Sequence, residues 1–168
     1  MTYKMPALLA WIASSWIIAV AGLQGSAHAE EEIRPIDIVA MDIARSVTAQ
    51  GAEMLEAGDI EGVVDQYIGT GELITTTTRP DRRPTTKIIR GKDNLRKYFK
   101  VAENLRELAP TNLIDYARIV APNTIYMTGI LKLTGNDEKV TRIPFSQVRV
   151  LIGTTWKIVS LQVIFQEK

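Results

Sequence analysis

The end of the chain constrains the fold more than any other stretch does. Residues 140–152 form a long run rich in β-branched and apolar side chains, and residues 156–166 form a second run of the same kind. Gly153, Thr154 and Thr155 separate the two runs, and this composition is typical of a tight turn. The sequence therefore predicts two long antiparallel strands joined as a hairpin, against which the earlier parts of the chain pack.

The first 29 residues differ in composition from the rest. Lys4 precedes an apolar stretch at residues 7–23, and residues 27–29 (Ala-His-Ala) have the small-x-small pattern that a signal peptidase cleaves. We expect a secretory signal at residues 1–29, a single domain at residues 30–168, and a secreted or periplasmic protein. The alternative is that residues 7–23 stay in place as a membrane anchor, although this stretch is short for a bilayer span.

Composition excludes several kinds of chemistry. The chain has no cysteine, and cleavage after Ala29 removes its only histidine, His28. Such a chain has no Ser-His-Asp triad, no cysteine nucleophile, no disulfide framework and none of the common zinc or haem sites. No run resembles a calcium loop, and we expect neither a metal nor a cofactor.

The overall charge of the domain bears on its partners. Cleavage takes away one of the 20 basic residues, Lys4, and none of the 19 acidic residues, so the formal net charge becomes zero. A general affinity for nucleic acid is therefore not expected.

The spacing of apolar residues divides the domain into helices and strands. Apolar residues at helical spacing predict helices over residues 36–57 and 60–68 and a third that begins near Lys92 and continues to residue 105. The first helix is expected to bury one stripe, formed by Ile36, Val39, Ile43, Val47, Met54 and Leu55. Strands are expected at residues 72–78, 85–90, 112–120, 124–133, 139–152 and 156–166, with a proline-punctuated loop at 79–84.

The order of these elements predicts the fold class. Helices and a short strand pair come first, and a four-stranded antiparallel meander ends the chain. Such an order is typical of an α+β domain, in which about three helices of the N-terminal half pack on one face of a curved, mostly antiparallel sheet.

Three segments carry a resemblance to a known superfamily. Residues 56–67 (EAGDIEGVVDQY) contain a helix break, residues 90–99 (RGKDNLRKYF) place a glycine before an amphipathic helix that ends in aromatics, and residues 156–161 (WKIVSL) form a final strand. Together they resemble the nuclear transport factor 2-like superfamily, which includes ketosteroid isomerase, SnoaL-like cyclases and a kinase association domain. The resemblance covers essentially all of residues 30–168. It implies a cone-shaped, cystatin-like roll with a deep apolar pocket between the first helix and the concave sheet.

The superfamily hosts enzymes and binding modules alike, so function has to be argued from the site. Counting from the break at Gly58, the catalytic positions of the isomerase branch fall at Thr75 for the carboxylate base, Gly51 for the tyrosine, and Ser146 for the protonated aspartate. A threonine hydroxyl does not take up a proton near neutral pH, and Gly51 has no side chain. The isomerase mechanism is therefore not expected here.

Hydroxyl-bearing residues are the candidates for ligand contacts in the implied pocket. Thr75, Thr77 and Ser146 would form its floor, and Tyr67 and Tyr126 would direct their phenols into it. The competing interpretation is that threonine simply favours strands and that the tyrosines belong to core packing. With Ser146 facing the pocket, the residues Phe145, Gln147 and Arg149 would lie on the outer face of the sheet, through which the superfamily resemblance implies a homodimer.

Charge is segregated along the chain. Residues 79–100 contain nine basic and two acidic residues, whereas residues 30–66 contain ten acidic and two basic residues. One interpretation is a basic lip at Arg79, Arg82 and Arg83 that recruits an anionic ligand, a lipid headgroup or an acidic partner. The other is that the two segments are neighbours, within one chain or across a dimer, and neutralise each other.

These observations lead to three hypotheses. The first is an exported, non-catalytic module that binds a small apolar or amphipathic molecule or a partner protein. The second is a SnoaL-like enzyme of the isomerase, cyclase or dehydratase type that uses unfamiliar residues such as Tyr126 or Asp115. The third is a structural or dimerisation module whose own side chains fill the pocket. A carboxylate in an accessible pocket favours the enzyme, and an apolar pocket with hydroxyl groups favours the binding module.

Overall fold

The computed structural model describes residues 37–101, 108–136 and 138–166. The expected signal segment at residues 1–29 and the expected helical residue Ile36 lie outside these ranges. Among the described residues, no helix is both long and apolar enough to cross a bilayer. The elements in chain order are α1 (Ile38–Ala57), α2 (Ile60–Asp65), β1 (Tyr67–Arg79), β2 (Arg82–Arg90), α3 (Lys92–Val101), β3 (Ala109–Ala121), β4 (Thr124–Thr134), β5 (Val140–Ile152) and β6 (Thr155–Gln166).

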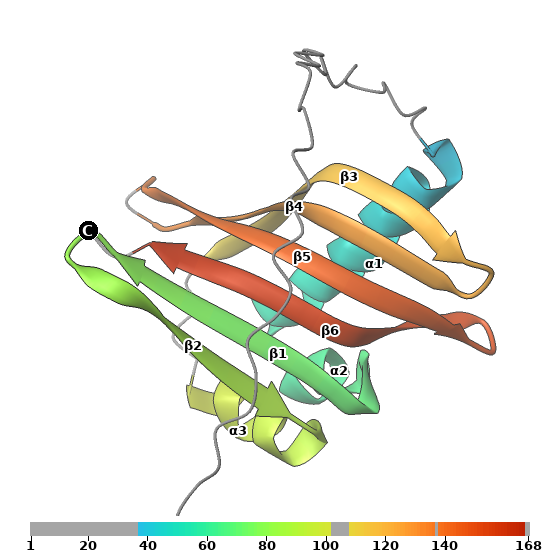
Figure 1. Cartoon of the computed structure of the whole chain (residues 1–168), viewed down its shortest axis with the longest axis horizontal. Helices are drawn as coiled ribbons and strands as arrows, with labels where there is room; N and C mark the ends of the chain where they lie inside the picture. Colours follow the sequence, from blue (N-terminus) through green and yellow to red (C-terminus); the bar gives the residue numbers. More distant parts are fainter. Residues whose placement is uncertain (1–36, 102–107, 137, 167–168) are drawn as a thin grey trace, which may run out of the picture. The chain divides into compact units, whose positions relative to one another are not determined.

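The strands form one six-stranded sheet in the order β2-β1-β6-β5-β4-β3 (Figure 1). Every neighbouring pair is antiparallel except β1 and β6, which are parallel. The sheet is curved, and the helices lie on one side of it, with α1 behind β3 and β4 in the view of Figure 1. The predicted α+β class with a mostly antiparallel curved sheet is confirmed, as is the C-terminal hairpin of β5 and β6.

The second helix is shorter than expected. We predicted a helix over residues 60–68, but α2 ends at Asp65 and Tyr67 already belongs to β1. The cause is the parallel neighbour β6, since the Ile158 amide donates to the Gln66 carbonyl at 2.7 Å and Tyr67 pairs with Ile158. Sheet pairing therefore overrides the helical spacing of the apolar residues and places Tyr67 on the sheet.

The loop predicted at residues 79–84 is also shorter than expected, because β2 begins at Arg82, which pairs with Arg79. Pro84 lies inside β2. A proline is tolerated there because β2 is an edge strand, and its missing amide interrupts no inner ladder.

The buried face of α1 differs from the predicted stripe. The buried residues of this helix are Ala40, Ala44, Thr48 and Ala52. Val39, which was expected inside, is 61% exposed, and larger residues such as Val47 are only partly buried beside the core. Small side chains let the helix approach the sheet closely, and the large apolar residues then lie along the flanks of the contact.

Side-chain and backbone caps fix both ends of α1. The Asp37 carboxylate accepts from the Ala40 amide at 2.9 Å and from the Ile119 amide of β3 at 3.2 Å, so the helix start is tied to the sheet. These backbone donors hold the pKa of Asp37 below its usual value. Gly58 ends the helix in the left-handed conformation, with φ of 68°, as its position before α2 predicted.

Candidate ligand cavity

A cavity of about 160 Å³ lies between the helices and the inner face of the sheet. Most of its wall is apolar. The sheet supplies Leu73, Leu131, Leu133, Ile143, Phe145, Ile158, Leu161, Val163 and Phe165, and the helices supply Ala52, Leu55, Val63 and Phe99. Among the described residues that line it, there is no aspartate, glutamate, histidine or lysine. Its polar groups come from a few residues, and these decide what the cavity can recognise.

The orientation of β5 is the reverse of the one expected. Phe145, Gln147 and Arg149 line the cavity, whereas Ser146 does not. The cross-strand pairs Phe145–Val163 and Gln147–Leu161 place all four side chains on the inner face. The prediction that Ser146 faces the pocket and that Phe145, Gln147 and Arg149 face outward is therefore wrong, and Ser146 lies on the opposite face.

The other candidate residues are dispersed over both faces of the sheet. Tyr67 lines the cavity, as expected. Thr75 and Thr77 pair with Val163 and Phe165 of β6 and share their face, but neither threonine is part of the cavity wall. Tyr126 lies on the outer face, where its ring centroid is 6.4 Å from that of Tyr116. The structure thus brings only one of the five candidate residues to the cavity.

The cavity has one polar end, which is organised by Arg149. Only 2% of this residue is exposed, and its guanidinium donates to four neutral oxygens. These are the side-chain oxygens of Gln147 at 2.7 Å and Gln66 at 2.8 Å, and the carbonyls of Trp156 at 3.2 Å and Val47 at 3.3 Å. Burial lowers the pKa of Arg149 to about 10, so the group remains a cation at neutral pH.

Hydrogen bonds within α1 and between α1 and β3 involve two more polar residues of the cavity wall, Thr48 and Asn112. The Asn112 amide donates to the Thr48 carbonyl at 2.9 Å, and the Thr48 hydroxyl donates to the Ala44 carbonyl at 2.7 Å. Gly51, in the middle of α1, leaves room for the amide of Gln66, because a Cβ at position 51 would lie 3.3 Å from the Gln66 side-chain oxygen. Glycine lowers the stability of a helix interior, and the space that the Gln66 side chain needs explains its presence at position 51.

Tyr67 contributes a further polar group to the residues of the wall. Only 2% of the residue is exposed, and its hydroxyl has no hydrogen-bond partner among the described residues. Burial raises the pKa of Tyr67, and the positive charge of Arg149 offsets part of that rise. The hydroxyl is therefore a neutral donor at physiological pH, and a buried donor without an acceptor is costly.

Sequence reasoning missed Gln66, Gln147 and Arg149 as parts of the site. The signal that could have found them is the position of β5, a central strand whose apolar run is interrupted by Gln147 and Arg149. Polar residues in a strand with neighbours on both sides are candidates for a buried polar cluster rather than for a solvated face. No group of three carboxylate or histidine side chains in the described part of the chain is arranged to hold a metal ion.

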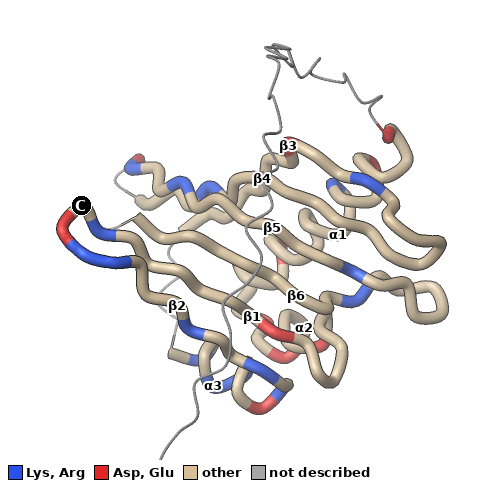
Figure 2. The backbone as a smooth tube through the Cα atoms, viewed as in Figure 1, with Lys and Arg blue, Asp and Glu red and all other residues tan. Residues whose placement is uncertain are grey.

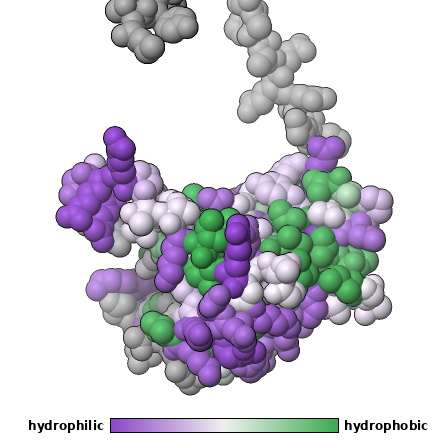
Figure 3. All heavy atoms as spheres, turned by 60° about the horizontal axis from the view of Figure 1, so that its bottom comes forward, coloured by the Kyte–Doolittle hydropathy of each residue, from purple (hydrophilic) through white to green (hydrophobic). Residues whose placement is uncertain are grey.

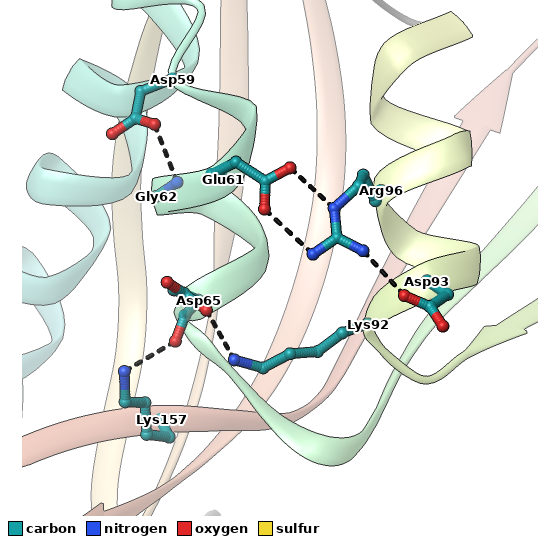
Figure 4. A network of polar contacts seen from close by, with 8 residues as sticks. All are labelled: Asp59, Glu61, Gly62, Asp65, Lys92, Asp93, Arg96 and Lys157. Carbon is teal, nitrogen blue, oxygen red and sulfur yellow. Dashed lines mark hydrogen bonds and ion pairs between the residues drawn. The ribbon is translucent and has the colours of Figure 1, made fainter.

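The segregated charges meet on the surface, where α2 and α3 face each other (Figures 2 and 4). Arg96 of α3 donates to both carboxylate oxygens of Glu61, at 2.7 and 3.0 Å, and to Asp93 at 2.8 Å. Lys92 donates to the Asp65 carboxylate at 2.6 Å. For these residues, the interpretation that acidic and basic segments neutralise each other within one chain is confirmed.

The basic lip has a different environment. Arg79 and Arg82 flank the turn between β1 and β2, and Arg82 lies 3.7 Å from Asp81. Figure 2 shows basic residues on both sides of this turn, at the end of the sheet remote from α2. Contact of Arg79, Arg82 and Arg83 with an anionic partner stays a prediction.

Comparisons with known proteins identify the fold. No protein-family model matches the chain, and no curated protein matches it. Among solved structures, it is similar to a domain of unknown function with a cystatin-like fold from Nostoc punctiforme, with a TM-score of 0.62, 13% identity, and coverage of 78% of this chain and 80% of that one. It is similar to an NTF2-like protein of unknown function from Shewanella oneidensis, with a TM-score of 0.58, 13% identity, and coverage of 74% and 98%.

A third similar structure is Aln2 from a Streptomyces species, with a TM-score of 0.58, 11% identity, and coverage of 78% of this chain and 93% of that one. At these identities the likeness concerns the fold and not the activity. The helix order and the curved, mostly antiparallel sheet agree with this likeness. The chain therefore has the nuclear transport factor 2-like, cystatin-like fold.

Proposed function

We propose that this protein is a binding module that takes one small, largely apolar molecule into the cavity beneath α1. The observation that carries the proposal is the cavity itself, about 160 Å³ with an almost entirely apolar wall. In another protein, an engineered apolar cavity of about 150 Å³ binds benzene, so this volume suits a ligand built on one ring or a short chain.

The enzyme hypothesis has less support from the cavity wall. General acid-base chemistry needs a group whose pKa lies near the working pH. The ionisable groups of the described wall are two tyrosines and Arg149, and burial raises the pKa of both Tyr67 and Tyr98. Asp115 and Tyr126, the alternatives considered from the sequence, are not part of this wall. The purely structural hypothesis requires a filled interior, which a cavity of this volume does not favour.

Ligand binding can be tested by blocking the cavity. Ala52 lies on the cavity wall, and Ala52→Leu adds three carbons there. Ala49→Leu makes the same change on the exposed side of the same helix and serves as the matched control. Toluene, followed by thermal shift and calorimetry, is expected to bind the wild type and Ala49→Leu, and to lose binding in Ala52→Leu. If the wild type, Ala49→Leu and Ala52→Leu bind toluene equally well, or if none of them binds it, the proposal is overturned.

We also propose that two copies pair through the outer face of the sheet. The supporting observation is the exposure of large apolar residues there, with Leu113 47% exposed and Tyr116 37% exposed on β3. On the side that Figure 3 displays, with the bottom of Figure 1 turned forward, hydrophobic surface also lies between hydrophilic patches. Sedimentation equilibrium is expected to give a dimer for the wild type and a monomer for Tyr116→Glu. A monomeric wild type contradicts the pairing.

We further propose that residues 1–29 direct export and are removed after Ala29. The support is the sequence pattern of this segment. The intact mass of protein recovered outside the cytoplasm is expected to correspond to a chain that begins at Glu30. Recovery of the full-length mass in the membrane fraction contradicts cleavage and favours the anchor.

A further inference from the structure

The starting point is that the buried cation Arg149 has no anionic partner within the described parts of the chain. It lies at one end of the cavity, and the four oxygens that it contacts among the described residues belong to two side-chain amides and two backbone carbonyls. Buried charges in proteins are normally paired with an opposite charge. Neutral acceptors solvate the guanidinium and fix its direction, but they leave its charge without compensation.

Arg149 also retains donor capacity. A guanidinium has five N–H groups, and four of them are accounted for by the hydrogen bonds to Gln147, Gln66, Trp156 and Val47. The fifth belongs to a residue that lines the cavity. A ligand in the cavity can therefore receive a charge-assisted hydrogen bond from Arg149 without displacing a protein acceptor.

The second observation is independent of the first. Tyr67 lines the same cavity, and its hydroxyl is buried and has no acceptor among the described residues. Tyr67 and Arg149 both pair with Ile158 of β6, from its two sides, so the two residues lie in one row across the sheet. Two donors at one end of an apolar chamber, one charged and one neutral, are complementary to an oxygen anion.

Building on the proposed binding function, we infer that the cavity ligand is a monoanionic carboxylic acid, with its carboxylate at Arg149 and Tyr67 and its apolar body against the β4–β6 wall. A carboxylate offers two oxygens for the two donors, and its single charge balances the single cation. A dianionic phosphate would leave one negative charge uncompensated in an apolar wall. A purely apolar ligand would leave both donors unsatisfied.

A surface groove with basic residues shares one wall residue with the cavity. Tyr98 lines the cavity and also a groove between β2 and α3, whose wall includes Lys87, Arg90 and Lys97. The Lys87 ammonium lies 5.9 Å from the centre of the Tyr98 ring. Figure 2 shows basic residues along β2 and α3. Basic residues close to the cavity raise the local concentration of anions there.

The test compares two probes of nearly equal shape, benzoate and its neutral isostere benzamide, by calorimetry at neutral pH. The wild type is expected to bind benzoate at least about tenfold more tightly than benzamide, the effect of one charge-assisted hydrogen bond. Tyr67→Phe is expected to reduce that preference several-fold, and Arg149→Gln to abolish it. Arg149 also donates hydrogen bonds to Gln66 and Gln147, so Arg149→Gln could prevent folding. In that case the comparison of the wild type with Tyr67→Phe decides the test.

Tyr126→Phe is the matched control, since it removes a hydroxyl from the outer face of the same sheet. It should leave the preference unchanged. Equal affinity for the two probes, or tighter binding of benzamide, overturns this inference and leaves the binding function standing. Failure of benzoate, benzamide and toluene alike overturns both. If Tyr67→Phe keeps the full preference for benzoate over benzamide, the placement of the carboxylate at Arg149 and Tyr67 is also overturned.

Discussion

The Arg149 guanidinium donates to the Gln66 side-chain oxygen at 2.8 Å, and this bond joins the middle of β5 to the end of α2 inside the protein. Because Gln66 is only 8% exposed, the bond is shielded from water. It gives the cavity its polar end and also holds a helix against the sheet. The stability and the binding properties of the protein are therefore coupled at this point.

Replacement of Gln66 by leucine tests the structural part of this coupling. Gln66→Leu removes an acceptor from a buried cation, which is expected to lower the free energy of unfolding by about 1–3 kcal/mol. Gln50→Leu, on the exposed face of α1, is the control and should change it by less than about 0.5 kcal/mol. Urea unfolding measures both, and equal effects of the two substitutions would contradict the account.

Tyr67→Phe should have the opposite effect on stability. Removal of a buried hydroxyl without a partner is expected to raise the free energy of unfolding by about 1 kcal/mol in the absence of a ligand. Tyr126→Phe should change it by less than about 0.5 kcal/mol. A loss of stability in Tyr67→Phe would mean that the hydroxyl has an acceptor in the folded chain, and would remove one support for the anion site.

The α2–α3 contact should make stability depend on pH in the acid range. The hydrogen bond from Arg96 lowers the pKa of Glu61 from its ordinary 4.5, and the hydrogen bond from Lys92 lowers the pKa of Asp65 from 3.8. A carboxylate whose pKa is lower in the folded state stabilises the protein above its unfolded pKa. That contribution is lost as the pH falls through the folded pKa.

The measurement is the urea midpoint at pH 6 and at pH 3. Glu61→Gln is expected to unfold at lower urea than the wild type at pH 6, and the gap should shrink at pH 3. Glu53→Gln, on the exposed side of α1, should show no such change. A gap for Glu61→Gln that is equal at both pH values would refute an electrostatic role for the pair.

Gly129 gives a test of the sheet geometry behind the cavity. The extra residue of a β-bulge, Asp115, lies where Ile114 and Tyr116 pair with consecutive residues of β4, and a Cβ at position 129 would collide with the Leu113 carbonyl oxygen. Gly129→Ala is therefore expected to destabilise the protein by at least about 2 kcal/mol.

Gly69→Ala is the control for this prediction. Gly69 also lies on a strand, and a Cβ there meets nothing within 4 Å. Its effect on the thermal midpoint should be small. A tolerated Gly129→Ala would mean that β3 and β4 are not as close as the structure places them.

The sequence was sufficient for the fold class because the long strands and their turns have strong local signals. The residues that face the cavity were not predictable in the same way. In β5, the odd-numbered residues include Ile143, Phe145 and Arg149, and the even-numbered ones include Ser146, Val148 and Val150, so both faces mix apolar and polar side chains. Alternation alone cannot choose between them. The buried glutamines and arginine resemble solvated residues until their partners on other elements are known.

In the first helix, too, the sequence pattern did not predict which residues are buried. Its large apolar residues suggested one stripe, but close packing on the sheet selects the small residues Ala40, Ala44 and Ala52 instead. Tyr67 was assigned to a helix because its apolar spacing fitted one, and pairing with β6 placed it on a strand. In both cases the deciding contact is made by a segment distant in the sequence.

The central claim is that the cavity accepts a small apolar molecule, and methyl NMR of the protein titrated with toluene tests it most directly. Saturable shifts are expected for the methyl groups of Leu133, Leu161 and Val163, which line the cavity, whereas those of Val150 and Ile164 on the outer face should stay in place. Unmoved cavity methyl groups up to the solubility limit of toluene, or equal shifts on both faces of the sheet, would contradict the claim.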